Sequence, residues 1–273
     1  MDRHRTVCCA FLEGLGSLAS STRMKTLRVG MVEQYILAHL KGSPENRRSL
    51  TSALRAFLRF CAERSYTAED LSTIVPSVPS YRMASLPKGM EDSALQRMLD
   101  TVPRDTPTGT RDYAIMLLMM AYGIRGKSAA ELLLDDLNWQ RSTIRIRAQK
   151  GGKEVILPLL DAVGEAILQY LRNRPATALR ELFLTVKAPI APTKSLIIAR
   201  MIRSYMLRAG VHLPSRGSVT LRHSWAIRAL AHDAPIKAIA DVLGHRSLNT
   251  TFIYAKADLK TLQQVAMPWP ERR

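Results

Sequence analysis

Five side chains of the kinds needed to break a phosphodiester follow one another along the chain. They are Arg125, Lys150, Arg222, His245 and Tyr254. A guanidinium group can hold two phosphate oxygens at once, a lysine can protonate a departing oxygen, and a histidine can donate to a phosphate oxygen. A tyrosine hydroxyl can then attack phosphorus and form a covalent intermediate. Together these groups predict phosphoryl transfer that needs no metal ion and no other cofactor.

Each residue taken singly has a plainer interpretation. Arg125 could form a salt bridge with Asp135 or Asp136, and the histidine could contact carbonyl groups at a helix end. Lys150 and Lys153 flank a Gly-Gly turn, where lysines are commonly only solvated. Most tyrosines pack in protein interiors, and this chain has eight of them. The prediction of an active site therefore rests on the ordered set.

Charge and composition narrow the class of protein. The chain has 273 residues and a formal net charge of +17, with a pI near 10.3. This excess predicts a nucleic-acid partner, although a basic protein without a particular partner remains an alternative. Cys8, Cys9 and Cys61 match neither metal-site spacing nor a disulfide framework, which favours a reducing cytoplasm. We see no signal peptide and no apolar run near the ~20 residues of a membrane span, so we expect no membrane partner.

Hydrophobic periodicity predicts a mainly α protein with a small antiparallel β-sheet. Alternation over residues 142–149, a Gly-Gly turn and an apolar run over 154–159 predict a β-hairpin. Helical spacing covers residues 27–40, 46–64, 91–101, 111–123, 129–134, 161–173, 193–209, 218–232, 235–243 and 247–254.

A proline-rich stretch divides the chain. Three prolines between residues 75 and 89 disfavour helix and predict an extended linker. We therefore expect a helical domain over residues 1–80, a linker over 81–89, and a second domain over 90–273 that ends in a tail from 255 to 273.

Arginines decorate the polar face of the predicted helix over residues 46–64. Arg47, Arg48, Arg55 and Arg59 lie off the stripe of apolar residues. We expect these arginines, with Lys153 at the hairpin tip, to bind DNA phosphates. The alternative is a solvated basic face, which charged helix faces commonly are.

The ordered residues resemble the tyrosine recombinase (phage integrase) family over nearly the whole chain. Residues 123–125 are similar to the first arginine box of that family, 150–153 to its hairpin lysine box, and 221–223 to its second arginine box. Residues 243–245 and 250–254 match its final box, which is the most specific piece. The resemblance implies a helical core-binding, DNA-binding domain followed by a mixed α/β catalytic domain.

The resemblance also implies a mechanism. Tyr254 would attack a DNA phosphate and leave a 3′-phosphotyrosine and a free 5′ hydroxyl, and a 5′ hydroxyl from a partner duplex would then attack the adduct. Arg125, Arg222 and His245 would stabilise the developing charge, and Lys150 would protonate the leaving oxygen. The partner is double-stranded DNA, bound by a homo-tetramer on paired sites that is a monomer or dimer when free. Such a protein is expected in the bacterial cytoplasm, associated with the nucleoid.

Two positions depart from the family pattern. Val219 stands three residues before Arg222, where the family usually has a histidine, and Ser128 stands where it often has a glutamate. Because a missing acid/base group costs ~10²–10⁴ in rate, we expect a slowed enzyme, with His212 and His223 as candidate substitutes. The alternatives are a catalytically impaired regulator of recombination that binds DNA, a type IB topoisomerase, and a basic helical scaffold.

Overall fold

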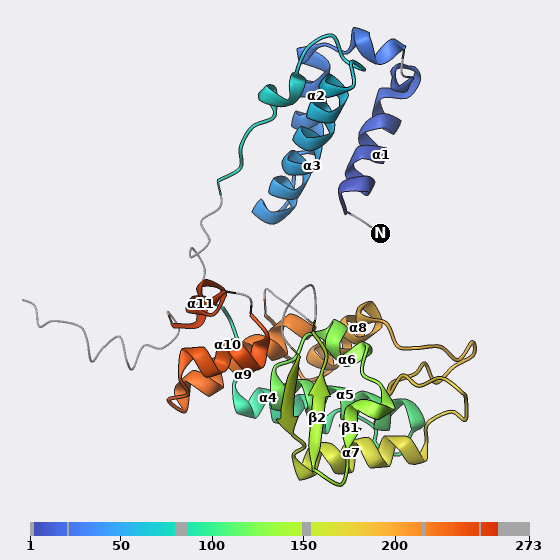
Figure 1. Ribbon diagram of the computed structural model, residues 1–273, viewed down its shortest axis with the longest axis vertical. Coiled ribbons are helices and arrows are strands. Elements are labelled where there is room, and N and C mark those ends of the chain that lie inside the picture. The colour runs from blue at the N-terminus through green and yellow to red at the C-terminus, as the bar shows by residue number, and fades with distance from the viewer. Residues whose placement is uncertain are drawn as a thin grey trace, which may run out of the picture. The chain divides into compact units, whose positions relative to one another are not determined.

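A computed structural model describes residues 3–20, 22–79, 87–148, 154–213, 217–245 and 247–255. Within these ranges the contacts divide the chain into two compact units, which fall within Met1–Arg82 and Met83–Arg273 (Figure 1). Each unit buries a hydrophobic core of its own. Among the described residues, no helix has both the length and the apolar character needed to cross a bilayer.

The first unit is helical, with α1 (Arg3–Leu15), α2 (Val29–His39) and α3 (Pro44–Glu63) as its longer elements. Short 3-10 turns at Gly16–Ala19, Arg23–Thr26 and Leu71–Ile74 complete it. The predictions of α2 and α3 are confirmed to within a few residues, whereas α1 was missed.

The start of α3 and its buried face follow from the sequence. The backbone N–H of Asn46 donates to Ser43 Oγ at 3.3 Å, and Pro44 occupies the first helical position. The apolar stripe of α3, which includes Leu54 and Leu58, packs with Phe11 of α1 in the core of this unit. The helix therefore turns its arginines away from that core.

The second unit is built around α5 (Pro107–Tyr122), which is buried along most of its length. The helices in contact with it are α4 (Asp92–Asp100), α6 (Gly126–Ala130), α7 (Asp161–Arg172), α8 (Ser195–Arg208) and α9 (Ser218–Ala231). After α9 follow α10 (Ile236–Leu243), a 3-10 turn at Leu248–Thr250 and α11 (Phe252–Ala255). Both α10 and α11 pack on α9, so segments far apart in the sequence meet at that helix.

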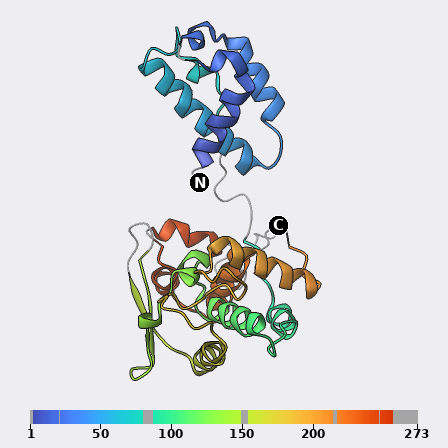
Figure 2. The same cartoon turned by 90° about the vertical axis from the view of Figure 1, so that its right-hand side faces the viewer.

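The sheet of the second unit has three antiparallel strands in the order β1 (Leu137–Asn138), β2 (Thr143–Ile146) and β3 (Val155–Pro158). It stands at the margin of this unit (Figure 2). The predicted hairpin is confirmed by the pairing of β2 with β3, although the turn over 149–153 lies outside the described residues. The short strand β1 was not predicted.

Two predicted helices have different bounds in the structure. The helix expected over 129–134 is α6, which ends at Ala130, because the next N–H groups bond elsewhere: that of Leu133 to the Asp136 carboxylate at 2.9 Å and that of Leu134 to the Arg180 carbonyl at 2.9 Å. The helix expected over 247–254 is split into a 3-10 turn and α11. The predicted tail over 255–273, apart from its first residue, and most of the predicted linker lie outside the described residues.

Candidate active site

One cavity of about 570 Å³ in the second unit is lined by four of the five predicted catalytic residues. Arg125 enters it from the start of α6, Arg222 from α9, His245 from just beyond α10, and Tyr254 from α11. No acidic side chain is found among the described residues that line this cavity. The cavity is therefore a concave, positively charged site with a tyrosine hydroxyl in its wall.

Arg222 is held by the ends of two helices. Its Nη1 donates to the Gly123 carbonyl at 3.0 Å and its Nη2 to the Leu243 carbonyl at 2.7 Å. These carbonyls belong to the C-terminal ends of α5 and α10, where backbone acceptors lack helical partners and the helix dipole favours a cation. Both helices end at a left-handed glycine, Gly123 and Gly244, each with φ of 60°.

The second guanidinium shares one of these acceptors. Arg125 Nη1 donates to the Leu243 carbonyl at 3.3 Å, so the two arginines approach each other across the end of α10. Arg222 is only 7% exposed, and burial together with the charge of Arg125 lowers its pKa to about 10. The ion pairs within the described part of the chain include neither arginine. Two crowded cations without a carboxylate form a site for an anion.

The plainer interpretation of Arg125 as a salt-bridge partner is wrong. Asp136 is fully buried and pairs with Arg145 and Arg147, both at 2.9 Å, while Asp135 pairs with Arg180. Arg125 is exposed and faces the cavity instead.

Tyr254 lies at the cavity wall with its side chain 1% exposed. Its hydroxyl oxygen is 2.8 Å from Nδ1 of His223, and the two rings meet edge to face with centroids 5.5 Å apart. Burial raises the pKa of the Tyr254 phenol, against the opposing effect of Arg222 and Arg125. The hydroxyl is therefore protonated at neutral pH and must lose its proton before it can attack.

His245 is oriented by a threonine that the sequence did not single out. Its Nδ1 lies 2.7 Å from Thr251 Oγ1, and Thr251 is fully buried. Burial, with Arg222 and Arg125 following, lowers the pKa of His245 to about 4, so the ring is neutral at neutral pH. When the Thr251 hydroxyl donates to Nδ1, Nε2 carries the proton and can donate to a phosphate oxygen. The two residues are six apart in the sequence, a spacing that does not place side chains on one face of a helix, so the sequence carried no signal for this contact.

Val219 lines the same cavity and is 53% exposed. Its side chain carries no proton and accepts none. The position thus faces the site, as the family pattern implies, without an acid or base on it.

The other predicted site residues are two lysines of the hairpin turn and four arginines of α3. Lys150 and Lys153 are outside the described residues. The predicted DNA-binding arginines Arg47, Arg48, Arg55 and Arg59 belong to α3, in the other unit.

Two of these arginines make contacts within their own unit. Arg48 donates to the Pro79 carbonyl at 3.1 Å and Arg55 to the Val75 carbonyl at 2.8 Å. Arg59 is exposed. The helix face is therefore not uniformly solvated, since part of it fastens the segment after Ile74 to α3.

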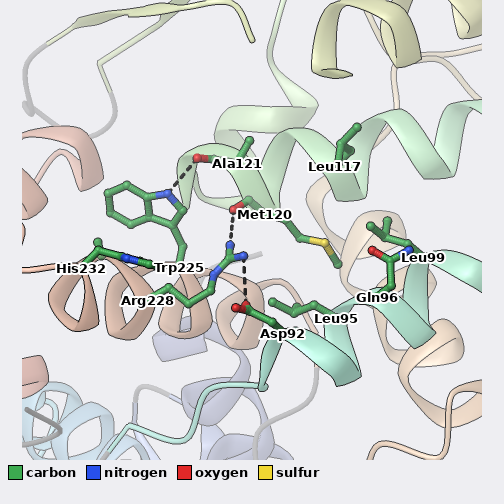
Figure 3. A pocket seen from close by; sticks show the side chains of 11 residues that line it. Asp92, Leu95, Gln96, Leu99, Leu117, Met120, Ala121, Trp225, Arg228 and His232 are labelled. Atoms are coloured by element: carbon green, nitrogen blue, oxygen red, sulfur yellow. Dashed lines mark hydrogen bonds and ion pairs between the residues drawn. The ribbon is translucent and has the colours of Figure 1, made fainter. Parts of the chain in front are cut away.

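A second cavity, of about 540 Å³, lies on a different face of α9 between α4 and α5 (Figure 3). Two side chains of α9 form hydrogen bonds beside it: Arg228 donates to the Met120 carbonyl at 2.7 Å and to Asp92 at 3.3 Å, and Trp225 donates to the Ala121 carbonyl at 2.8 Å. These bonds hold α9 against α4 and α5.

Comparison with known proteins gives consistent matches. The Phage integrase family matches residues 88–260. A Sinorhizobium fredii protein named as an integrase/recombinase, y4rA, is 39% identical over 81% of this chain and 54% of its own length, so the chain spans about half of that relative.

Two solved structures have the same fold. XerH site-specific recombinase bound to palindromic difH substrate, in a post-cleavage complex, has a TM-score of 0.70 at 20% identity and covers 88% of this chain and 72% of that one. The Tn1549 transposon integrase in complex with circular intermediate DNA has a TM-score of 0.63 at 16% identity and covers 93% and 91%. The mainly α fold with its three-stranded antiparallel sheet is thus the one that recombinases and integrases adopt.

Proposed function

Because the chain belongs to the phage integrase family, the tyrosine recombinases, we propose that it cuts and rejoins double-stranded DNA at a specific site through a 3′-phosphotyrosine intermediate. The observation that carries this proposal is the cavity in which two guanidinium groups without a carboxylate partner meet a tyrosine hydroxyl. XerH and the Tn1549 integrase, which have this fold, were solved with a difH substrate and with circular intermediate DNA.

Each residue has a role in the proposed reaction. Arg125 and Arg222 bind the non-bridging oxygens of the scissile phosphate, and His245 donates a further hydrogen bond from Nε2. Their stabilisation grows as negative charge accumulates on phosphorus, so it lowers the barrier. Tyr254 Oη forms the bond to phosphorus while the bond from phosphorus to the 5′ oxygen breaks. Lys150, on the hairpin between β2 and β3, supplies the proton to the departing oxygen.

The rejoining step reverses the first. A 5′ hydroxyl of a partner duplex attacks the phosphotyrosine, and the tyrosine leaves with a proton. Because one phosphodiester is exchanged for another, the reaction needs neither a metal ion nor ATP. We further propose that four copies act on two paired sites, that the free protein is a monomer or dimer, and that it works on DNA in the bacterial cytoplasm, at the nucleoid.

The relatives do not favour the alternative of a catalytically impaired regulator, since they are named as recombinases and integrases. The Arg47, Arg48, Arg55 and Arg59 face of α3 and Lys153 remain proposed contacts to DNA phosphates, with the exposed Arg59 the clearest of them.

A covalent-adduct assay tests the proposal. The full chain is incubated with a pool of duplexes that have a randomised core and a nick, so that the short fragment released by cleavage diffuses away and the adduct accumulates. We expect a protein–DNA adduct that resists detergent, and sequencing of its DNA identifies the site.

Two variants make the assay specific. The adduct should be lost in Tyr254→Phe and kept in Tyr113→Phe. Tyr113 is the matched control because it lies on α5 outside the cavity, with its ring packed against the guanidinium of Arg104. An adduct that persists in Tyr254→Phe would show that another nucleophile acts, and DNA binding without any adduct in the native protein would favour the regulator.

A further inference from the structure

The position that lacks a histidine lies one helical turn from a histidine that reaches the nucleophile. Val219 and His223 are four residues apart on α9, so they lie on the same face of the helix, and both line the cavity. His223 Nδ1 lies 2.8 Å from Tyr254 Oη, within the range for proton transfer along a hydrogen bond. The proton acceptor that residue 219 cannot supply is thus present at residue 223.

We propose that His223 is a catalytic residue, the general base that takes the proton of Tyr254 as the tyrosine attacks DNA. This inference rests on the proposed function, because it assigns the proton of the same nucleophile. As the Oη–P bond forms and the P–O5′ bond breaks, the Tyr254 proton moves to His223 Nδ1. The departing 5′ oxygen receives its proton from Lys150, the proposed general acid. In rejoining, the imidazolium returns the proton to Oη as tyrosine leaves.

The other histidines are less suited to this step. Nδ1 of His245 is engaged by Thr251 at 2.7 Å, and the low pKa of His245, about 4, makes its ring a weak base. His212 is exposed beyond α8, and no interaction between it and Tyr254 exists among the described residues. The edge-to-face contact of the His223 and Tyr254 rings also restricts the orientation of the two rings that share this hydrogen bond.

The positive charges around His223 help to keep its ring neutral, and a bound DNA phosphate would offset them. Arg222 is its neighbour on α9, Arg125 and Lys127 face the cavity from α6, His245 from beyond α10, and Tyr254 from α11. Burial first, and then Arg222, lower the pKa of His223 below its ordinary 6.5, so its lone pair is free at neutral pH. A phosphate bound between the arginines offsets their charge, which makes the imidazolium easier to form.

A kinetic comparison tests the inference, with the DNA site identified in the adduct assay as the substrate. His223→Gln should slow adduct formation by ~10²–10⁴, as loss of a general base does, while DNA affinity and thermal unfolding stay unchanged. His232→Gln, at the C-terminal end of the same helix and outside the cavity, should keep the native rate. Replacement of Tyr254 by 3-fluorotyrosine, whose phenol is more acidic, should recover part of the rate lost in His223→Gln.

The pH profile separates a base from a merely structural contact. Because protonated His223 cannot accept a proton, the native rate at subsaturating DNA should fall as the pH drops through the His223 pKa, below 6.5. That acid limb should be absent in His223→Gln. A His223→Gln rate equal to or faster than the native rate would overturn the inference, and a faster one would show that His223 only holds the tyrosine back.

A measurement without DNA keeps the inference independent of the proposed function. In the full chain with 3-fluorotyrosine at position 254, the ¹⁹F resonance should shift as His223 titrates. The shift should vanish in His223→Gln and persist in His245→Gln. A resonance that shows no such inflection would refute the shared proton, even if the protein cleaves DNA. A clear inflection with no adduct on any duplex would support the His223–Tyr254 pair and count against recombinase activity alone.

Discussion

Asp136 is expected to carry much of the stability of the second unit, and Asp136→Ala tests this. Its side chain is completely buried beside the sheet, where it accepts from Arg145 of β2, from Arg147 just beyond it, and from the backbone N–H of Leu133. The substitution leaves two cations and one N–H group without their acceptor. It also loosens β2, the strand that leads to Lys150.

The size of the effect follows from the exposure of the partners. Removing one member of a fully buried ion pair costs about 3–5 kcal/mol because the remaining charge is stranded. Here the side chains of Arg145 and Arg147 are 40% and 42% exposed and can regain water, so the loss should fall at the lower end of that range. We expect the free energy of unfolding to drop by about 3 kcal/mol, with the Leu133 N–H group contributing part of it.

Urea denaturation followed by tryptophan fluorescence measures this loss. The signal reports on the second unit, which contains Asp136, because all three tryptophans belong to that unit: Trp139, Trp225 and Trp269. Asp135→Ala is the matched control: the neighbouring carboxylate pairs with Arg180 at an exposed position, where ion pairs stabilise little, so its unfolding curve should match the native one. Equal losses in the two variants, or no loss in Asp136→Ala, would refute the assignment of stability to the buried carboxylate.

Three further predictions concern the glycine at the end of α5, the basic helix α3 and the half-buried His245. Gly123→Ala should lower the free energy of unfolding by about 3 kcal/mol, because a Cβ at φ of 60° would lie 2.8 Å from the Trp225 ring. Gly210→Ala is the control: at φ of 69° in open space, it should cost only about 1 kcal/mol. Equal costs in the two variants would contradict a clash with Trp225. Arg59→Ala should weaken DNA binding and reduce the salt slope by about 1, whereas Arg55→Ala, which frees the Val75 carbonyl, should lower thermal stability more than it changes that slope; the reverse pattern would move the DNA contact. The unfolded chain binds more protons than the folded one between the His245 pKa of about 4 and its ordinary 6.5, so the free energy of unfolding should fall as pH drops through this window. His245→Gln should remove up to about 3 kcal/mol of that fall, and an unchanged pH dependence would show that His245 is not buried as a neutral ring.

The helices and the hairpin of the second unit were predictable because periodicity is a local property. The α10 stop at Gly244 and the pairing of β2 with β3 follow from residues close in sequence. The early end of α6 has a non-local cause: beyond Ala130, the backbone N–H of Leu134 bonds to the carbonyl of Arg180, far along the chain. No spacing rule reports such a partner.

The same division holds for the site. The sequence by itself determined which side chains could do the chemistry, since the types and order of Arg125, Arg222, His245 and Tyr254 are written in it. Only the tertiary structure decided that Arg222 ties together the ends of two helices, and that the histidine in contact with the Tyr254 hydroxyl is His223. Hydrogen-bond partners depend on directions and distances that arise when helices pack, and those are set by the whole core rather than by any local run of residues.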